Sequence, residues 1–115
     1  MSQAQMQRAE LARRTRRKRV LMQSVIADVS GSHLFDCTIL DVSDEGARIR
    51  LPAKYELPKI YYLINVPTRL AYEAVTVWRN STQVGVRFAK TIPVAATTDP
   101  ALAFLRRLWL QAAAG

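Results

Sequence analysis

Six short segments with the composition of β-strands follow one another along this chain, each separated from the next by turn-forming residues. They cover residues 20–29, 37–41, 47–51, 60–66, 70–78 and 84–88. Residues 47–51 alternate apolar and basic side chains with period two, the pattern of a strand with one buried face. Short strands at this spacing predict a small antiparallel barrel or sandwich. Closing the sheet would also remove exposed edges, which a small domain must otherwise protect.

The segments that flank the strands predict helices of different strength. Residues 98–113 carry the clearer signal, because Asp99 suits the N-cap, Pro100 suits the first helical position, and apolar side chains recur on one face. We expect this helix to pack on the barrel (residues 20–90), and a second subunit is the alternative. Residues 1–19 contain good helix formers but no strong apolar stripe. They predict a basic arm or marginal helix that orders on binding, and a frayed terminus is the alternative.

The positive charge of the chain is concentrated in that arm. The net charge is +8 at pH 7, and residues 8–19 hold seven basic residues against the single acid Glu10. The arm therefore supplies six of the eight net charges, and the barrel segment is close to neutral. A charge of this kind predicts attraction to nucleic acid, nucleotides, phosphates or an anionic membrane surface.

The sequence gives little support for catalysis. The one histidine, His33, lies in a Gly-Ser-His segment that predicts a solvated loop, and it has no partner at metal-ligand spacing. The acids are scattered, and neither a phosphate-binding loop nor a dinucleotide fingerprint is present. We therefore expect a protein that is not an enzyme, with no metal and no cofactor.

The single cysteine and the absence of long apolar runs bear on the compartment. Cys37 lies in an apolar strand segment, which predicts a small buried side chain and not a reactive thiol. A lone cysteine favours a reducing cytoplasm. The first 19 residues lack the apolar core of a signal peptide, and no apolar run reaches the roughly 18 residues that span a bilayer.

Two short motifs are candidates for an anion site. Residues 13–19 read Arg-Arg-Thr-Arg-Arg-Lys-Arg, directly before the first strand segment. The arginine fork can bind a phosphate, or the O6/N7 edge of guanine, through two parallel hydrogen bonds. The second motif is a turn, and it reads Asp41-Val42-Ser43-Asp44-Glu45-Gly46.

The turn offers complementary chemistry. The carboxylate of Asp41 can accept hydrogen bonds from the N1–H and the exocyclic amine of guanine, and the Ser43 hydroxyl can donate to a phosphate. Gly46 permits a backbone geometry that brings both side chains close to a ligand. A solvated basic tail and an ordinary Asx-type turn are the alternative interpretations.

The order and spacing of the two motifs resemble the PilZ domain family over about residues 10–89. The Arg-x-x-x-Arg signature of the family corresponds to residues 13–17, and its Asp/Asn-x-Ser-x-x-Gly signature corresponds to residues 41–46. A frame that ended at Arg19 would have Thr15 four residues earlier, so only the frame of Arg13 and Arg17 has arginine at both positions.

The resemblance implies a mainly β fold, a six-stranded antiparallel β-barrel that binds the bacterial second messenger cyclic di-GMP. Arg13 and Arg17 would be the signature arginines. Trp78 resembles another family position, which we expect mainly in the core or the barrel wall, and a place beside the ligand is the alternative. The ligand-binding residues that the resemblance implies are Arg13, Arg14, Arg16, Arg17, Asp41, Ser43 and Gly46.

The favoured function is a non-catalytic cyclic di-GMP receptor or adaptor that changes conformation on binding and signals to an unidentified downstream protein. One alternative is a small basic β-barrel that binds nucleic acid. Such proteins usually expose aromatic side chains on a sheet face, on which bases stack. Most tyrosines here are expected in the core or at its rim, which disfavours that function. Another alternative is a PilZ-like interaction module that has lost ligand binding. The sequence leaves open a monomer or a homodimer, and one ligand or a stacked pair.

Overall fold

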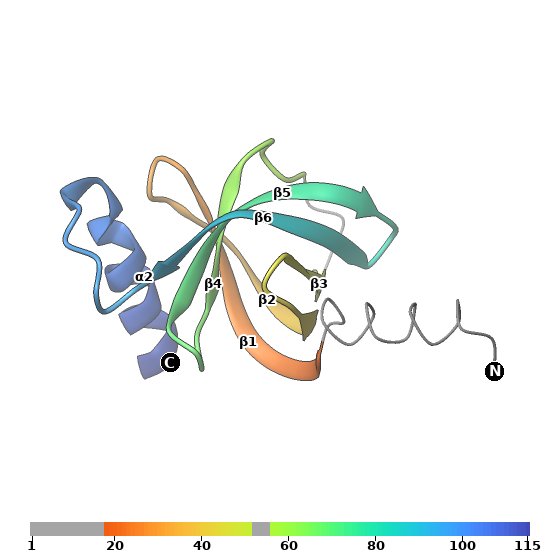
Figure 1. Ribbon diagram of the computed structural model, residues 1–115, viewed down its shortest axis with the longest axis horizontal. Coiled ribbons are helices and arrows are strands. Elements are labelled where there is room, and N and C mark those ends of the chain that lie inside the picture. Colours follow the sequence, from red (N-terminus) through yellow and green to blue (C-terminus); the bar gives the residue numbers. More distant parts are fainter. Residues whose placement is uncertain (1–17, 52–55) are drawn as a thin grey trace, which may run out of the picture.

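The computed structural model describes residues 18–51 and 56–115 as a six-stranded barrel with a helix against it (Figure 1). The elements are β1 (Lys18–Asp28), β2 (His33–Val42), β3 (Gly46–Arg50), β4 (Tyr61–Asn65), β5 (Leu70–Arg79), β6 (Gln83–Pro93), the 3₁₀ turn η1 (Pro100–Leu102) and α2 (Ala103–Ala114). The strands are hydrogen-bonded in the order β1-β2-β3-β6-β5-β4, and β4 pairs with β1 to close the barrel. The predicted fold class is confirmed.

The strands extend further than the sequence pattern indicates. β1 already begins at Lys18, so Lys18 and Arg19 belong to the sheet and not to the arm. β2 begins at His33, which therefore lies in a strand and not in the expected loop, and β6 runs on to Pro93. Strand ends are set by pairing across the sheet, which the side-chain pattern of one segment does not contain. The expected arm helix up to residue 17 lies outside the described residues.

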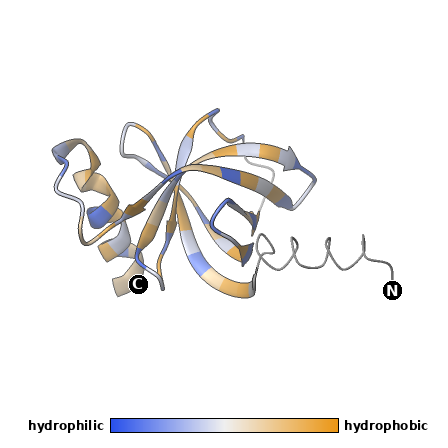
Figure 2. Cartoon of the chain, in the orientation of Figure 1, coloured by the Kyte–Doolittle hydropathy of each residue, from blue (hydrophilic) through white to orange (hydrophobic). Residues whose placement is uncertain are grey.

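The barrel interior forms the first of two hydrophobic cores. Its members are Ile26, Cys37, Ile39, Ala47, Ile49, Leu51, Tyr61, Leu63, Tyr72, Ala74, Val84 and Val86. Successive residues of a strand face opposite sides, and in β1 the run from Val25 to Ala27 is buried on both sides. Val25 and Ala27 belong to the second core, which lies outside the barrel wall. Figure 2 shows hydrophobic residues along the strands and along much of α2.

The second core lies between the barrel wall and α2. Leu105 and Leu108 of the helix are almost fully buried against β1, β4, β5 and β6. Trp109 joins them, and its indole Nε1–H donates to the carbonyl of Val66 at 2.8 Å. The helical segment starts as a 3₁₀ turn, in which the Asp99 carboxylate accepts from the backbone N–H of Ala101. The helix therefore packs on the barrel of its own chain.

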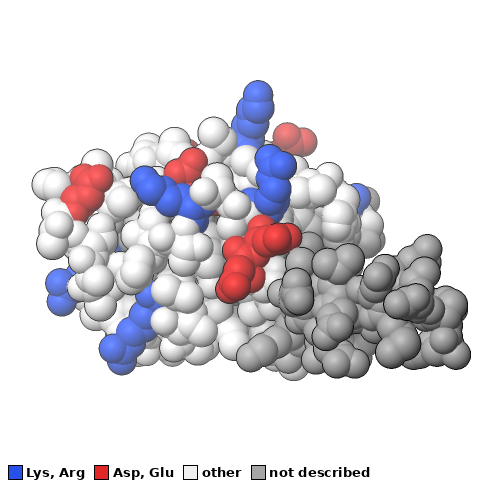
Figure 3. Space-filling model, in the orientation of Figure 1, with Lys and Arg blue, Asp and Glu red and all other residues white. Residues whose placement is uncertain are grey.

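The two ends of the molecule differ in what they carry. α2 lies at one end, and the start of β1 and the β2–β3 turn lie toward the other (Figure 1). On the face that Figure 3 shows, basic and acidic side chains are interspersed and do not gather by sign. Among the described residues, neither η1 nor α2 has the length and apolar character of a membrane-spanning helix.

Candidate ligand-binding site

Four residues form a line across the outer face of the barrel, which we call the outer row. Asp41 of β2 pairs with Arg48 of β3. Gly85 of β6 pairs with Arg48 on one side and with Trp78 of β5 on the other. Directly paired residues of antiparallel strands project from the same face of a sheet. Ile49, the next residue on β3, belongs to the interior core, so the outer row faces away from the interior.

Two β-bulges place the ends of the outer row on this face. The register of β2 against β3 shifts between Ile39 and Asp41. Ile39 is fully buried in the barrel interior, and without the extra residue Asp41 would face the same way two positions later. The register of β5 against β6 shifts between Thr76 and Trp78. Both bulges redirect the side chain that follows them toward the outer face.

Asp41 and Arg48 form an ion pair in the outer row. The Arg48 Nε–H donates to Asp41 Oδ2 at 2.8 Å, and the side chains are 34% and 12% exposed. The same guanidinium donates from Nη1 to the Gln83 side-chain oxygen at 3.2 Å. Hydrogen bonds between two charged groups are stronger than neutral ones, and a largely buried pair is less screened by salt. Arg48 of β3 therefore holds the carboxylate of Asp41, and Gln83 of β6 holds Arg48.

The β2–β3 turn is shaped by Ser43. Its backbone N–H donates to the carbonyl of Gly46 at 2.8 Å, and its hydroxyl accepts from the backbone N–H of Glu45 at 3.2 Å. The hydroxyl also lies 3.4 Å from the Gly46 carbonyl, which is a long hydrogen bond. A hydroxyl can rotate to a better acceptor, so Ser43 can donate to a phosphate oxygen without rebuilding the turn.

The turn is fixed to the barrel end through β6. The backbone N–H of Phe88 donates to the carbonyl of Glu45 at 2.8 Å. Beneath it the Phe88 ring stacks on Tyr72, with ring centres 3.8 Å apart. Burial raises the pKa of the Tyr72 hydroxyl, and the nearby charge of Asp44 raises it further. The turn is therefore hydrogen-bonded to a residue whose ring is packed on Tyr72.

Gly46 is required for space and not for an unusual backbone angle. Among the glycines of the chain, only Gly31 has a positive φ. A Cβ on Gly46 would lie 2.2 Å from the backbone oxygen of Val86 on the neighbouring strand. The sequence-based reason for this glycine, backbone freedom near the ligand, is therefore replaced by close approach of β3 to β6.

The first strand, β1, begins next to the turn of residues 41–46. Lys18 pairs with Val42, and Arg19 pairs with Asp41. Because Arg17 directly precedes Lys18 in the sequence, the Arg-x-x-x-Arg motif is attached where β1 meets this turn. The predicted ligand-binding residues Asp41, Ser43 and Gly46 lie in the described β2–β3 region, whereas Arg13, Arg14, Arg16 and Arg17 lie outside the described residues.

Trp78 lies on the barrel wall and is 39% exposed. A Cβ on Gly85 would lie only 2.0 Å from the indole Nε1, so the ring covers the backbone of β6 at this glycine. Because it is exposed, Trp78 does not lie in the core. Of the two expected positions, the barrel wall is the one observed. An exposed indole at the end of the outer row offers a surface on which a base can stack.

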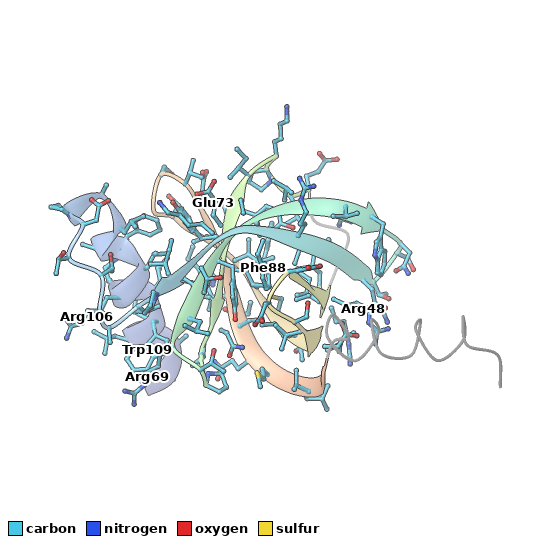
Figure 4. All side chains as sticks on the ribbon, in the orientation of Figure 1. Arg48, Arg69, Glu73, Phe88, Arg106 and Trp109 are labelled. Atoms are coloured by element: carbon cyan, nitrogen blue, oxygen red, sulfur yellow. The ribbon has the colours of Figure 1, made fainter. Side chains whose placement is uncertain are left out.

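The sequence interpretation missed three members of this site: Arg48, Gln83 and Gly85. A signal for Arg48 was present, because counting outward from the four-residue turn 43–46 pairs residue 41 with residue 48 in a regular hairpin. Nothing local marks Gln83 or Gly85, which come from a strand far along the chain. Figure 4 places Arg48 at the end of the barrel remote from Trp109 and α2.

Two open cavities lie away from the outer row. One, of about 540 Å³, lies between α2 and the β1–β2 hairpin, and its lining includes Gln23, His33 and Gln111. Another, of about 310 Å³, is lined by residues 56–59 with Thr76 and Arg79. Neither is lined by the β2–β3 turn. Neither of these two cavities therefore includes Asp41, Ser43 or Gly46 in its lining.

His33 and Cys37 both have structural surroundings in the part of the chain that the structure describes. Within residues 18–51 and 56–115, no group of three or more His, Cys, Asp or Glu side chains could hold a metal ion. His33 bonds to Asp36 at 2.9 Å near the surface. Cys37 is buried, and burial raises the pKa of its thiol to about 12 although a hydrogen bond from Ser24 opposes this. A thiol of this kind is a weak nucleophile.

Comparison with known families assigns the fold. The family model of the PilZ domain matches residues 12–100, which is most of the chain. The chain therefore belongs to the PilZ domain family, as the two motifs predict. PilZ domains are cyclic di-GMP-binding modules and are generally non-catalytic receptor domains. No curated protein matches this chain.

Proposed function

We propose that this chain is a non-catalytic receptor for cyclic di-GMP. The ligand closes the arm (residues 1–17) over the outer row, and the changed surface addresses a downstream protein in the reducing cytoplasm of a bacterium. The observation that supports this most is the strand register at the start of β1. It brings the attachment point of the arginine motif next to the Asp41–Gly46 turn.

The two motifs match the two kinds of group in the ligand. Cyclic di-GMP combines two guanines with two phosphates, so it needs guanine recognition and charge neutralisation in one place. In this proposal Arg13 and Arg17, assisted by Arg14 and Arg16, bind phosphate and the O6/N7 edge of guanine. Asp41 accepts from the N1–H and the amine of guanine, and Ser43 donates to a phosphate.

In this proposal the exposed indole of Trp78 forms one side of the ligand site. It lies in line with Asp41, with Arg48 and the bare backbone of Gly85 between them. A guanine held by Asp41 has its flat face available for stacking on an aromatic ring along the row. Stacking of a base on an aromatic side chain contributes about 1–3 kcal/mol.

The site is completed only when the arm closes. The two cavities described above lie away from the Asp41–Gly46 turn. In this proposal the arm encloses the ligand, and its residues 8–17 carry five arginines against the single acid Glu10. Ligand contacts made only in the closed state drive the change of conformation.

Titration calorimetry with cyclic di-GMP tests the proposal. We expect saturable binding that is weakened at least about tenfold by Arg17→Ala or by Asp41→Ala, since each removes charge-assisted hydrogen bonds of about 1.5–3 kcal/mol. Cyclic di-AMP should bind much more weakly, because adenine lacks the N1–H and the amine that Asp41 accepts from.

Matched control variants separate the site from general charge effects. Asp36→Ala removes an exposed acid from the same strand as Asp41; its side chain is 81% exposed and contacts His33. Arg106→Ala removes an exposed arginine from α2, at the other end of the barrel (Figure 4). Both controls should bind like the unchanged protein. Absence of binding, or equal losses in site and control variants, would contradict the proposal.

A further inference from the structure

We propose that Arg48, supported by Gln83, is a positioning residue that makes this site selective for guanine by fixing the carboxylate of Asp41. The inference rests on the proposed function, and it adds to the site two residues that lie outside both sequence motifs. In it, Arg48 acts through Asp41 and makes no contact with the ligand itself.

The contacts form a continuous chain across three strands. Gln83 of β6 accepts from Arg48 Nη1 at 3.2 Å, and Arg48 Nε of β3 donates to Asp41 Oδ2 of β2 at 2.8 Å. The three side chains come from adjacent strands of one sheet. The planar guanidinium presents its donors in a fixed fork, so anchoring one nitrogen on Gln83 sets the direction in which Nε meets the carboxylate.

The anchor acts on a carboxylate that lies next to a β-bulge. Asp41 follows a β-bulge, where the regular ladder that would hold a strand residue in place is interrupted. Recognition of guanine requires both carboxylate oxygens in the plane of the base, facing two parallel N–H groups. Ordering the side chain before the ligand arrives removes that entropic cost from the binding step.

The ion pair leaves the carboxylate able to bind a ligand. Each carboxylate oxygen has two lone-pair directions, so an oxygen that accepts from Arg48 can accept a second donor. The Asp41 side chain is 12% exposed and its Oδ1 is buried, so a ligand reaches that oxygen only when its surroundings move. Arg48 approaches from β3, whereas the arm is attached through β1 on the opposite flank of β2. Arg48 and the strand that carries the arm therefore flank Asp41 on opposite sides.

The first test measures the ligand-free protein. Three-bond couplings that report the Asp41 χ1 angle should indicate one rotamer in the unchanged protein and averaging in Arg48→Met. Arg50→Met is the matched control, because Arg50 lies on the same strand and the same face, and its change removes the same charge. A single Asp41 rotamer in Arg48→Met would overturn the inference without involving the ligand.

The second test is a double-mutant cycle with cyclic di-GMP, followed by nuclear magnetic resonance up to millimolar ligand. Arg48→Met should weaken binding roughly tenfold, the low end of the 10–100-fold that removing supporting partners costs at metal sites. Added to Asp41→Ala, it should change binding less than about twofold, because a residue that acts through Asp41 has nothing left to position. Arg48→Lys should restore little, since an ammonium cannot donate to Asp41 and Gln83 in the same fork.

The outcomes separate this inference from the proposed function. If the unchanged protein binds cyclic di-GMP and Arg48→Met binds equally well, the positioning role is wrong and the receptor function stands. If Arg48→Met causes the same loss with and without Asp41, Arg48 contacts the ligand directly, and the positioning role is again wrong. If the unchanged protein does not bind, the proposed function fails and the inference fails with it.

Discussion

Replacing Gly46 with alanine tests how closely the motif turn is held against the barrel. The added Cβ would lie 2.2 Å from the backbone oxygen of Val86, whereas unstrained contacts between heavy atoms lie near 3.5 Å. The obstacle is backbone and cannot rotate away. β3 and β6 must therefore separate by about 1 Å at this point.

The energetic consequence follows from that displacement. Overpacking of this kind costs about 1–3 kcal/mol. A shift of about 1 Å also lengthens the bond that ties the turn to β6, from Phe88 N to Glu45 O, now 2.8 Å, and loss of one such bond costs about 1 kcal/mol. We expect Gly46→Ala to lower the free energy of unfolding by about 2–4 kcal/mol.

Urea unfolding followed by circular dichroism measures this change, and Gly115→Ala is the matched control. A Cβ on Gly115 meets only the Gln111 and Ala112 carbonyl oxygens, at 3.5 and 4.0 Å, so the control should stay within about 0.5 kcal/mol of the unchanged protein. A Gly46→Ala variant with an unchanged midpoint and slope would refute the close approach of β3 to β6.

Three further outcomes are expected. Gly85→Ala should displace the Trp78 ring, because the new Cβ would lie 2.0 Å from its Nε1; a changed tryptophan emission spectrum is the readout, and an identical spectrum would contradict the contact. The free energy of unfolding should fall as pH rises from about 9 towards 12, because the pKa of Cys37 is raised from 9.0 to about 12 in the fold and the unfolded chain loses this proton first; Cys37→Ala should flatten that slope, and urea unfolding at several pH values measures it. Leu105→Ala should destabilise by about 2–5 kcal/mol because the side chain is fully buried under α2, whereas Leu110→Ala, at a 51% exposed position, should have little effect in the same assay.

The fold could be predicted because its determinants are local. Alternating segments such as residues 47–51, bounded by proline and polar turns, indicate strands whatever their partners are. The helix start was equally local, since Asp99 and Pro100 carry the capping chemistry by themselves. The strand ends were less predictable: His33 joins β2 through its pairing with Ala27, which no property of the Gly-Ser-His segment announces.

The candidate site was predictable only in its motif residues. Asp41 and Ser43 can be read from the sequence because their spacing matches a known signature. The surroundings of Asp41 depend on a β-bulge, and a bulge is a property of two strands together. Gln83 reaches the site from a strand that is distant in sequence and adjacent only in the barrel. The space that Gly85 leaves for the Trp78 ring is likewise visible only in three dimensions.

The two tryptophans of the chain give the most direct test of where the ligand binds. Trp78 lies in the outer row, whereas Trp109 belongs to α2 and its indole N–H donates to the carbonyl of Val66. In a proton–nitrogen correlation spectrum, saturating cyclic di-GMP should shift the indole signal of Trp78 and leave that of Trp109 in place. A shift confined to Trp109, or no shift of either indole with the ligand bound, would contradict a site on the outer row.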